Sequence, residues 1–94
     1  MLCTFKSRSL RAYWENNDEA GIRPDWLKKT RIILDALHAA TAPEELNLPG
    51  FGFHPLKGDR AGIYSVKVSR NWRITFRWDG YDAIDVDLED YHGG

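Results

Sequence analysis

The spacing of apolar residues changes from a helical to an alternating period near the middle of the chain. In residues 24–42, apolar side chains recur at the spacing that buries one face of a helix, at Leu27, Ile33, Leu34, Leu37 and Ala40. Pro24 suits the first turn of this helix, and Pro43 marks its end. Residues 7–17 predict a shorter helix whose buried side carries Leu10, Tyr13 and Trp14. The N-terminal half therefore favours two helices.

The second half of the chain contains three segments with the alternation of half-buried strands, residues 62–69, 72–78 and 82–88. The side chains expected to face the core are Tyr64, Val66, Val68, Trp72, Ile74, Phe76, Trp78, Ile84, Val86 and Leu88. The opposite face is expected to be polar and open, with Ser65, Lys67, Arg73, Thr75 and Arg77 on it. Residues 1–5 can add a short strand. The sequence thus predicts an α+β fold in which two N-terminal helices pack on one face of a small, mainly antiparallel sheet.

Length and cysteine content limit the class of protein. A chain of 94 residues is expected to form one domain, residues 1–94. The single cysteine, Cys3, excludes a disulfide within the chain and a cysteine-based zinc site. No segment approaches the roughly 20 apolar residues of a membrane span, and the N-terminus lacks the apolar run of a signal peptide. We expect a cytoplasmic protein that does not bind a membrane.

Charge is segregated along the chain, although the net charge is only −1. Residues 51–77 hold six Lys or Arg and one acid, whereas residues 78–92 hold six acids and no Lys or Arg. Such blocks can create a local positive field that attracts phosphates. The alternative is that Lys67 and Arg77 pair with Asp85 and Asp87 across the sheet.

The segment "GFHPLKGDRAG", residues 52–62, carries several side chains that suit proton transfer or phosphate binding. His54 and Lys57 lie in it, and Asp59 and Arg60 are expected to shape its turn. Antiparallel strands bring the start of one strand beside the end of its neighbour. Arg73 at a strand start can therefore meet this loop and the C-terminal "EDYH", which contains Asp90, Tyr91 and His92.

These residue types suit the cleavage of RNA without a metal. RNA supplies its own nucleophile, the 2′-hydroxyl, so the protein must move protons and stabilise negative charge. Histidine transfers protons near neutral pH, Lys and Arg stabilise negative charge, and tyrosine stacks on unpaired bases. A lone histidine is more often a surface or structural residue, and His38 on the longer helix is interpreted that way.

The segments "HPLKGDRAG", "SVKVSRNWRITF" and "DLEDYH" occur in the order and spacing of a known family. Residues 46–92 resemble the HigB branch of the RelE-type toxins of bacterial toxin–antitoxin modules. The resemblance implies the RelE-like microbial RNase fold and ribosome-dependent cleavage of mRNA in the A site, which blocks translation and growth. It implies no metal and no cofactor. The implied partners are the 70S ribosome, mRNA and a helix-turn-helix antitoxin of the HigA type, through which the complex binds its operator DNA.

The resemblance also assigns roles to residues of this chain. His92 is the expected general acid or general base. Asp90 is expected to orient or tune the C-terminal tail, and Tyr91 to stack on or position an RNA base. Lys57 and Arg73 are expected to stabilise the phosphate charge, with His54 helping proton transfer or phosphate positioning. The expected RNA-binding residues are Lys67, Arg70 and Arg77.

One position departs from the family pattern. Where some relatives have an arginine two residues before the Asn of "NWR", this chain has Ser69, and its arginine is Arg70. The absence of a well-placed glutamate base is no objection in this family, because the resemblance implies that the ribosome supplies part of the geometry. Trp72 lies on the same side of its strand as Ile74 and Phe76 and is expected in the core.

Two other classes of function remain open at this point. The chain can be a catalytically silent module that only binds an antitoxin or the ribosome. A general RNA-binding domain is a further alternative, but the acidic block in residues 78–92 disfavours it because acids repel phosphates.

Overall fold

The computed structural model describes residues 1–90, and both predicted helices are present in it. Helix α1 (Arg8–Asn16) begins after Ser7, whose side chain accepts a hydrogen bond from the Leu10 N–H, and ends at Asn17 in a left-handed conformation. Helix α2 (Leu27–Ala39) follows a short 3₁₀ helix, η1 (Pro24–Trp26). Pro24 therefore lies in η1 and not in the first turn of α2, where it was expected. A second 3₁₀ helix, η2 (Pro43–Leu46), follows α2.

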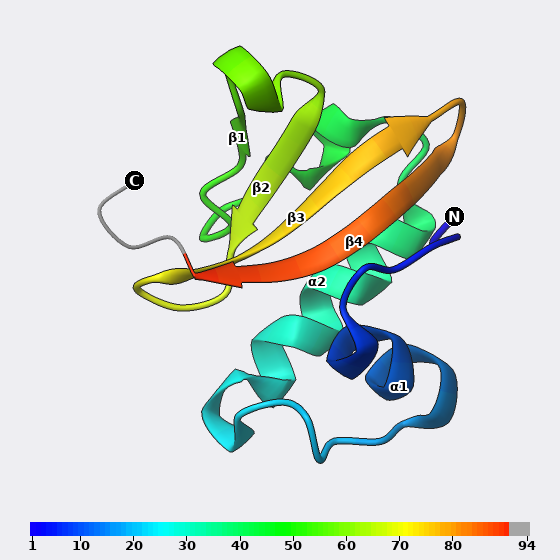
Figure 1. Ribbon diagram of the computed structural model, residues 1–94, viewed down its shortest axis with the longest axis vertical. Coiled ribbons are helices and arrows are strands. Elements are labelled where there is room, and N and C mark those ends of the chain that lie inside the picture. Colours follow the sequence, from blue (N-terminus) through cyan, green and yellow to red (C-terminus); the bar gives the residue numbers. More distant parts are fainter. Residues whose placement is uncertain (91–94) are drawn as a thin grey trace.

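A four-stranded antiparallel sheet forms the second half of the protein (Figure 1). Its strands are β1 (His54–Pro55), β2 (Ile63–Lys67), β3 (Trp72–Asp79) and β4 (Asp82–Asp90), in the spatial order β1-β2-β3-β4. The 3₁₀ helix η3 (Gly58–Arg60) joins β1 to β2. The N-terminal segment runs parallel to β4 and bridges it at Leu2 and Phe5, but it does not form the short strand that was expected there.

The two helices pack on one face of the sheet, as the apolar patterns predict (Figure 1). The fully buried side chains of the core include Leu10, Ile33, Leu34, Leu37, Val66, Ile74, Phe76 and Val86. Trp72 packs against this core, with its ring centroid 5.4 Å from that of Trp26, so its predicted place is confirmed. Apolar burial on this face is the main force that holds the helices to the sheet.

A β-bulge in β4 changes the predicted register. Thr75 pairs with Asp87, but Arg77 pairs with Ile84, so β4 has one more residue than β3 between these pairs. Asp85 adopts a positive φ of 52° at this point. The prediction that Ile84 faces the core is therefore wrong: Ala83 is fully buried instead, and Ile84 lies opposite Arg77.

The face away from the helices is less open than expected. Ser65 is fully buried, and Thr75 is only 2% exposed. The hydroxyl of Ser65 donates a weak hydrogen bond to the His54 carbonyl of β1, and the hydroxyl of Thr75 donates to Glu89. Both buried hydroxyls thus have partners, as buried polar groups require. Lys67, Arg73 and Arg77 remain at least partly exposed on this face.

Candidate active site

Strand pairing places the polar residues of the face opposite the helices in two rows. Residues directly opposite one another in a sheet project to the same side. One row runs across all four strands, through His54, Ser65, Thr75 and Asp87. The next row runs across three strands, through Lys67, Arg73 and Glu89. We call these seven residues the polar face.

Arg73 connects the polar face to the loop that precedes β1. Its Nη1 donates hydrogen bonds of 3.0 Å to the Ser65 hydroxyl and 3.0 Å to the Gly52 carbonyl. Gly52 has a positive φ of 56°, and a Cβ there would lie 3.5 Å from the Cβ of Lys67. The backbone therefore turns closely over the polar face at this point. The charge of Arg73 is held beside the neighbouring cation Lys67.

Arg60 reaches the polar face from η3. Its Nη2 donates to the Glu89 Oε2 at 2.6 Å, and the Thr75 hydroxyl donates to the same oxygen at 2.5 Å. The hydrogen bond from Arg60 is the main cause of a lowered pKa at Glu89, with that from Thr75 also lowering the pKa. Glu89 is thus a carboxylate held in its ionised form between a cation and a hydroxyl.

His54 and Lys57 lie on the exposed side of the loop between Gly52 and η3. His54 is in β1 and belongs to the first row of the polar face, and Lys57 directly precedes η3. Both are exposed, and within residues 1–90 neither side chain has a hydrogen bond or an ion pair. The imidazole of His54 on the polar face and the ammonium group of Lys57 at the following turn are thereby exposed to solvent.

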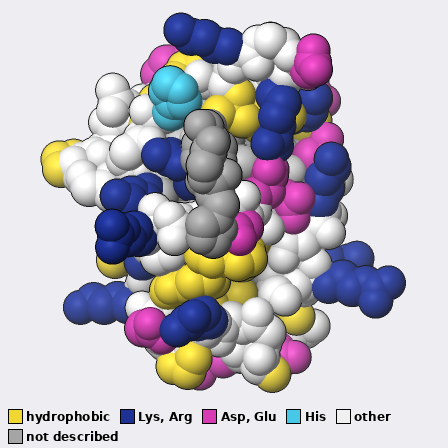
Figure 2. Space-filling view, turned by 60° about the vertical axis from the view of Figure 1, so that its left-hand side comes forward, with side chains coloured by type: hydrophobic (Ala, Val, Ile, Leu, Met, Phe, Trp, Pro, Cys, Tyr) yellow, Lys and Arg dark blue, Asp and Glu magenta, His cyan; other side chains and the backbone are white. Residues whose placement is uncertain are grey.

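The combined arrangement suits an anionic ligand that needs both charge stabilisation and proton transfer. The guanidinium of Arg73 and the ammonium groups of Lys57 and Lys67 supply positive charge, and His54 can donate or accept a proton. In Figure 2, Lys and Arg side chains lie at the left, at the top and along the right edge, and a group of acidic side chains lies near the centre. Residues 1–90 contain no group of three His, Cys, Asp or Glu that could hold a metal ion.

The chain is similar to known proteins over nearly its whole length. A family model described as "RelE-like toxin of type II toxin-antitoxin system HigB" matches residues 3–92. The chain belongs to the HigB toxin family. It is 38% identical over 92 residues to Endoribonuclease HigB of Proteus vulgaris, covering 98% of this chain and all of that protein. It is 28% identical over 91 residues to Toxin HigB-1 of Vibrio cholerae serotype O1, covering 95% of this chain and 96% of that protein.

Membership of the HigB family confirms the resemblance seen in the sequence, and the observed α+β architecture agrees with it. A toxin of a type II toxin–antitoxin system has an antitoxin as its partner. None of the helices between residues 1 and 90 has both the length and the apolar character needed to cross a membrane.

The three predicted RNA-binding residues of this HigB-family chain lie at different places. Lys67 is exposed beside Arg73, and Arg70 is exposed in the turn between β2 and β3. Arg77 lies further along β3, roughly 13 Å from Arg73 at the usual rise per residue. Among the described residues neither Lys67 nor Arg77 forms an ion pair with Asp85 or Asp87, so the alternative of cross-strand neutralisation is not found there.

The predicted C-terminal part of the site is only partly within the described residues. Asp90 is the last residue of β4, is exposed, and pairs with Trp72, whose side chain faces the helices. Asp90 therefore projects to the face of the sheet opposite to that of Glu89. Tyr91 and His92 lie outside the described residues, so their assigned roles stay predictions.

Sequence reasoning missed the link between Arg60 and Glu89. Arg60 was expected to shape its own turn, and its side chain also contacts Glu89 of β4, 29 positions away. Glu89 was given no role, yet it lies opposite Arg73 on the polar face. Its place in the strand alternation was a signal for that face, whereas no local pattern indicates the contact with Arg60.

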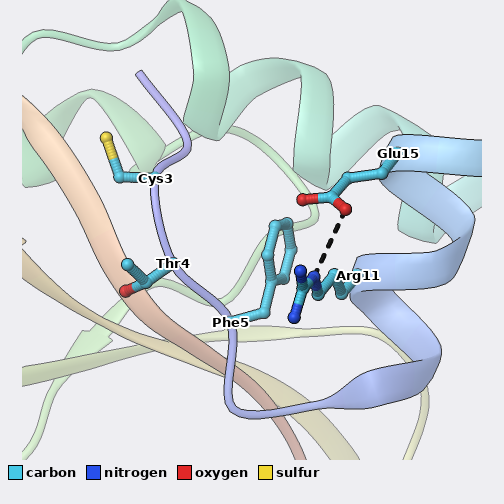
Figure 3. Close-up of a pocket in the computed structure, with 5 residues that line it drawn as sticks. All are labelled: Cys3, Thr4, Phe5, Arg11 and Glu15. Atoms are coloured by element: carbon cyan, nitrogen blue, oxygen red, sulfur yellow. Dashed lines mark hydrogen bonds and ion pairs between the residues drawn. The ribbon is translucent and has the colours of Figure 1, made fainter.

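A surface hollow of about 240 Å³ lies away from the polar face. It is lined by Cys3, Thr4 and Phe5 of the N-terminal segment and by Arg11 and Glu15 of α1 (Figure 3). Arg11 and Glu15 pair with each other at 3.3 Å along the helix. None of these residues belongs to the candidate site.

Proposed function

We propose that this HigB-family toxin is an endoribonuclease that cleaves mRNA in the A site of the 70S ribosome and thereby inhibits translation and growth. Two observations support the proposal: the cations and the histidine gathered around the polar face, and the 38% identity to a protein named Endoribonuclease HigB. The first observation carries the argument, because the histidine His54 and the cations Lys67 and Arg73 project from the same face of the sheet. The protein acts in the cytoplasm, where its substrate is translated.

The reaction proposed is an internal attack by the RNA. The 2′-hydroxyl loses its proton and attacks the adjacent phosphorus, and the bond from phosphorus to the 5′-oxygen breaks. The departing 5′-oxygen takes up a proton, so the products are a 2′,3′-cyclic phosphate and a 5′-hydroxyl. This reaction needs no metal and no cofactor, because the nucleophile belongs to the substrate.

The roles follow from the chemistry of each side chain. Arg73 and Lys57 stabilise the negative charge that develops on the phosphoryl oxygens. His54 positions the phosphate or transfers a proton. His92 acts as the general acid or general base, and Asp90 tunes the C-terminal tail. Tyr91 stacks on an RNA base. Lys67, Arg70 and Arg77 bind the RNA backbone, each contributing a charge whose effect falls as salt rises.

The proposed partner is an antitoxin of the HigA type, a helix-turn-helix protein. The toxin–antitoxin complex binds its operator DNA through the antitoxin. Co-purification of the toxin with the product of a neighbouring small reading frame tests the first statement, and a gel-shift assay on the shared promoter tests the second.

The activity is tested with purified protein and two substrates, one mRNA programmed on ribosomes and the same mRNA free in solution. We expect cleavage of the first, with a cyclic phosphate at the new 3′ end, and little cleavage of the second. Addition of EDTA at a concentration that leaves ribosomes intact should not stop cleavage. Expression without antitoxin that leaves mRNA intact would instead identify a catalytically silent binding module.

A further inference from the structure

The ion pair between Arg60 and Glu89 differs from the other ion pairs of residues 1–90. Its N–O distance is 2.6 Å, and its side chains are 43% and 23% exposed. The other three pairs measure 3.3–3.7 Å and join side chains that are 44–71% exposed. Exposed pairs contribute little to stability, because solvent screens them and ordering two long side chains costs entropy. The Arg60–Glu89 pair is shorter and better shielded from solvent.

The side chain of Glu89 is held in place by a hydrogen bond from the neighbouring strand of the sheet. Thr75 is 2% exposed in the central strand β3, and its hydroxyl donates to the Oε2 of Glu89 at 2.5 Å. A buried hydroxyl needs such a partner, so Thr75 and Glu89 define each other's orientation. The carboxylate therefore offers Arg60 a docking point whose position the strands determine.

Arg60 transmits that position to the turn that carries Lys57. The Arg60 N–H donates to the Lys57 carbonyl at 3.3 Å, and the Ala61 N–H donates to the Gly58 carbonyl at 3.1 Å. The side chain of Arg60 and the backbone of Lys57 thus belong to one short turn. The other end of the loop is tied down by Arg73 through the Gly52 carbonyl at 3.0 Å.

We propose that Arg60 and Glu89 are positioning residues that hold the Lys57 turn against the polar face for RNA cleavage. The catalytic consequence rests on the proposed function, but the contact between Arg60 and Glu89, here called the latch, is a property of the free protein. Neither residue is assigned contact with RNA, and both act through the backbone of residues 57–61. Two anchors then hold the loop that bears His54 and Lys57, Arg73 at its start and Arg60 at its end.

The test uses the full chain with Glu89→Gln, Arg60→Lys and the charge-reversed pair Arg60→Glu with Glu89→Arg. Hydrogen exchange of the Arg60 and Ala61 amides reports the latch without any need for activity. Single-turnover cleavage on programmed ribosomes, measured over a range of ribosome concentrations, separates the maximal rate from the apparent affinity. Glu15→Gln is the matched control, because it breaks the Arg11 pair on α1, far from the loop.

We expect Glu89→Gln to accelerate exchange of the two amides about tenfold, because a hydrogen bond to a charged group is lost. The maximal cleavage rate should fall by about the same factor, with little change in apparent affinity. Arg60→Lys should show a smaller effect of both kinds, since it keeps the charge. The reversed pair should recover part of both losses, and Glu15→Gln should change neither.

Exchange at Arg60 and Ala61 that is unchanged in Glu89→Gln would overturn the latch. Faster exchange with an unchanged maximal rate would overturn the positioning role. A wild-type protein that cleaves no mRNA on ribosomes would refute the proposed function, and exchange alone would then decide whether the pair holds the turn. Arg60→Lys keeps the test decisive if Glu89→Gln does not fold.

Discussion

The guanidinium of Arg73 lies 3.0 Å from the hydroxyl oxygen of Ser65, a diagonal neighbour on the adjacent strand. Through the same nitrogen Arg73 also holds the Gly52 carbonyl at 3.0 Å. Arg73 therefore has a structural task in addition to the charge that it brings to the polar face. The two tasks can be separated by experiment.

Arg73→Lys should retain part of the activity, because it keeps the charge but loses the rigid planar guanidinium whose Nη1 holds Ser65 and Gly52. Arg73→Ala should lose about 10²–10³-fold in the single-turnover cleavage rate, the usual effect of removing one group that stabilises transition-state charge. Cleavage on programmed ribosomes measures both. Arg8→Ala on α1 removes an equal charge elsewhere and should have no effect. Equal losses in Arg73→Lys and Arg73→Ala would show that geometry matters more than charge.

His54→Ala and Lys57→Ala should reduce cleavage without reducing stability. Both side chains are exposed and have no partner within residues 1–90, so their removal leaves no buried group unsatisfied. We expect rate losses on the order of 10²-fold or more if His54 takes part in proton transfer. The free energy of unfolding in urea should stay within about 0.5 kcal/mol of wild type. A large drop in stability would assign these residues to the fold instead.

Lys67→Ala and Arg77→Ala should weaken RNA binding through charge alone. Each substitution removes one cation from the exposed surface, so the slope of log affinity against log salt should become less steep by about 0.7 for a single strand. Fluorescence anisotropy with a short labelled RNA at several salt concentrations measures this slope. Lys28→Ala on α2 is the control. A loss of affinity that does not vary with salt would contradict a simple phosphate contact.

Asp85 should be sensitive to substitution because of its backbone conformation rather than its charge. Its φ is 52°, and its N–H donates to the Thr4 hydroxyl at 2.8 Å. Asp85→Val should lower the free energy of unfolding by about 1–2 kcal/mol, since a β-branched residue is strained in the left-handed region. Asp85→Asn and Asp85→Gly should be nearly neutral. Urea denaturation of the three variants tests whether the bulge is required.

Acid should weaken the contact between Arg60 and Glu89. The pKa of Glu89 is lowered from 4.5, so the folded state binds its proton less readily than the unfolded state does. The stabilisation is therefore present above pH 4.5 and is lost as pH falls through the lower pKa of the folded state. Glu89→Gln should remove this part of the pH dependence. Thermal unfolding of both proteins between pH 3 and 7 is the measurement, and parallel curves would contradict the prediction.

The elements of the fold were predictable because their signals are local. The spacing of Leu27, Ile33 and Leu37 indicates a helix by itself, and the alternation around Val66 and Ile74 indicates strands. The bulge at Asp85 was not predictable, because the alternation of apolar and polar residues in the sequence of β4 continues across it. Only pairing with β3 and with Thr4 of the N-terminal segment shows that Ala83, not Ile84, is buried.

The sequence by itself determined two helices, an antiparallel sheet and a polar sheet face that carries Arg73, with His54 and Lys57 in the segment before it. These features follow from residue periodicity and from the adjacency of strand starts and strand ends in an antiparallel sheet. Tertiary structure alone decided which groups meet on that face. Arg60 and Glu89 are 29 positions apart and are brought together by the path of the loop over the sheet. Contacts of this kind depend on the packing of whole elements, so no short stretch of sequence contains them.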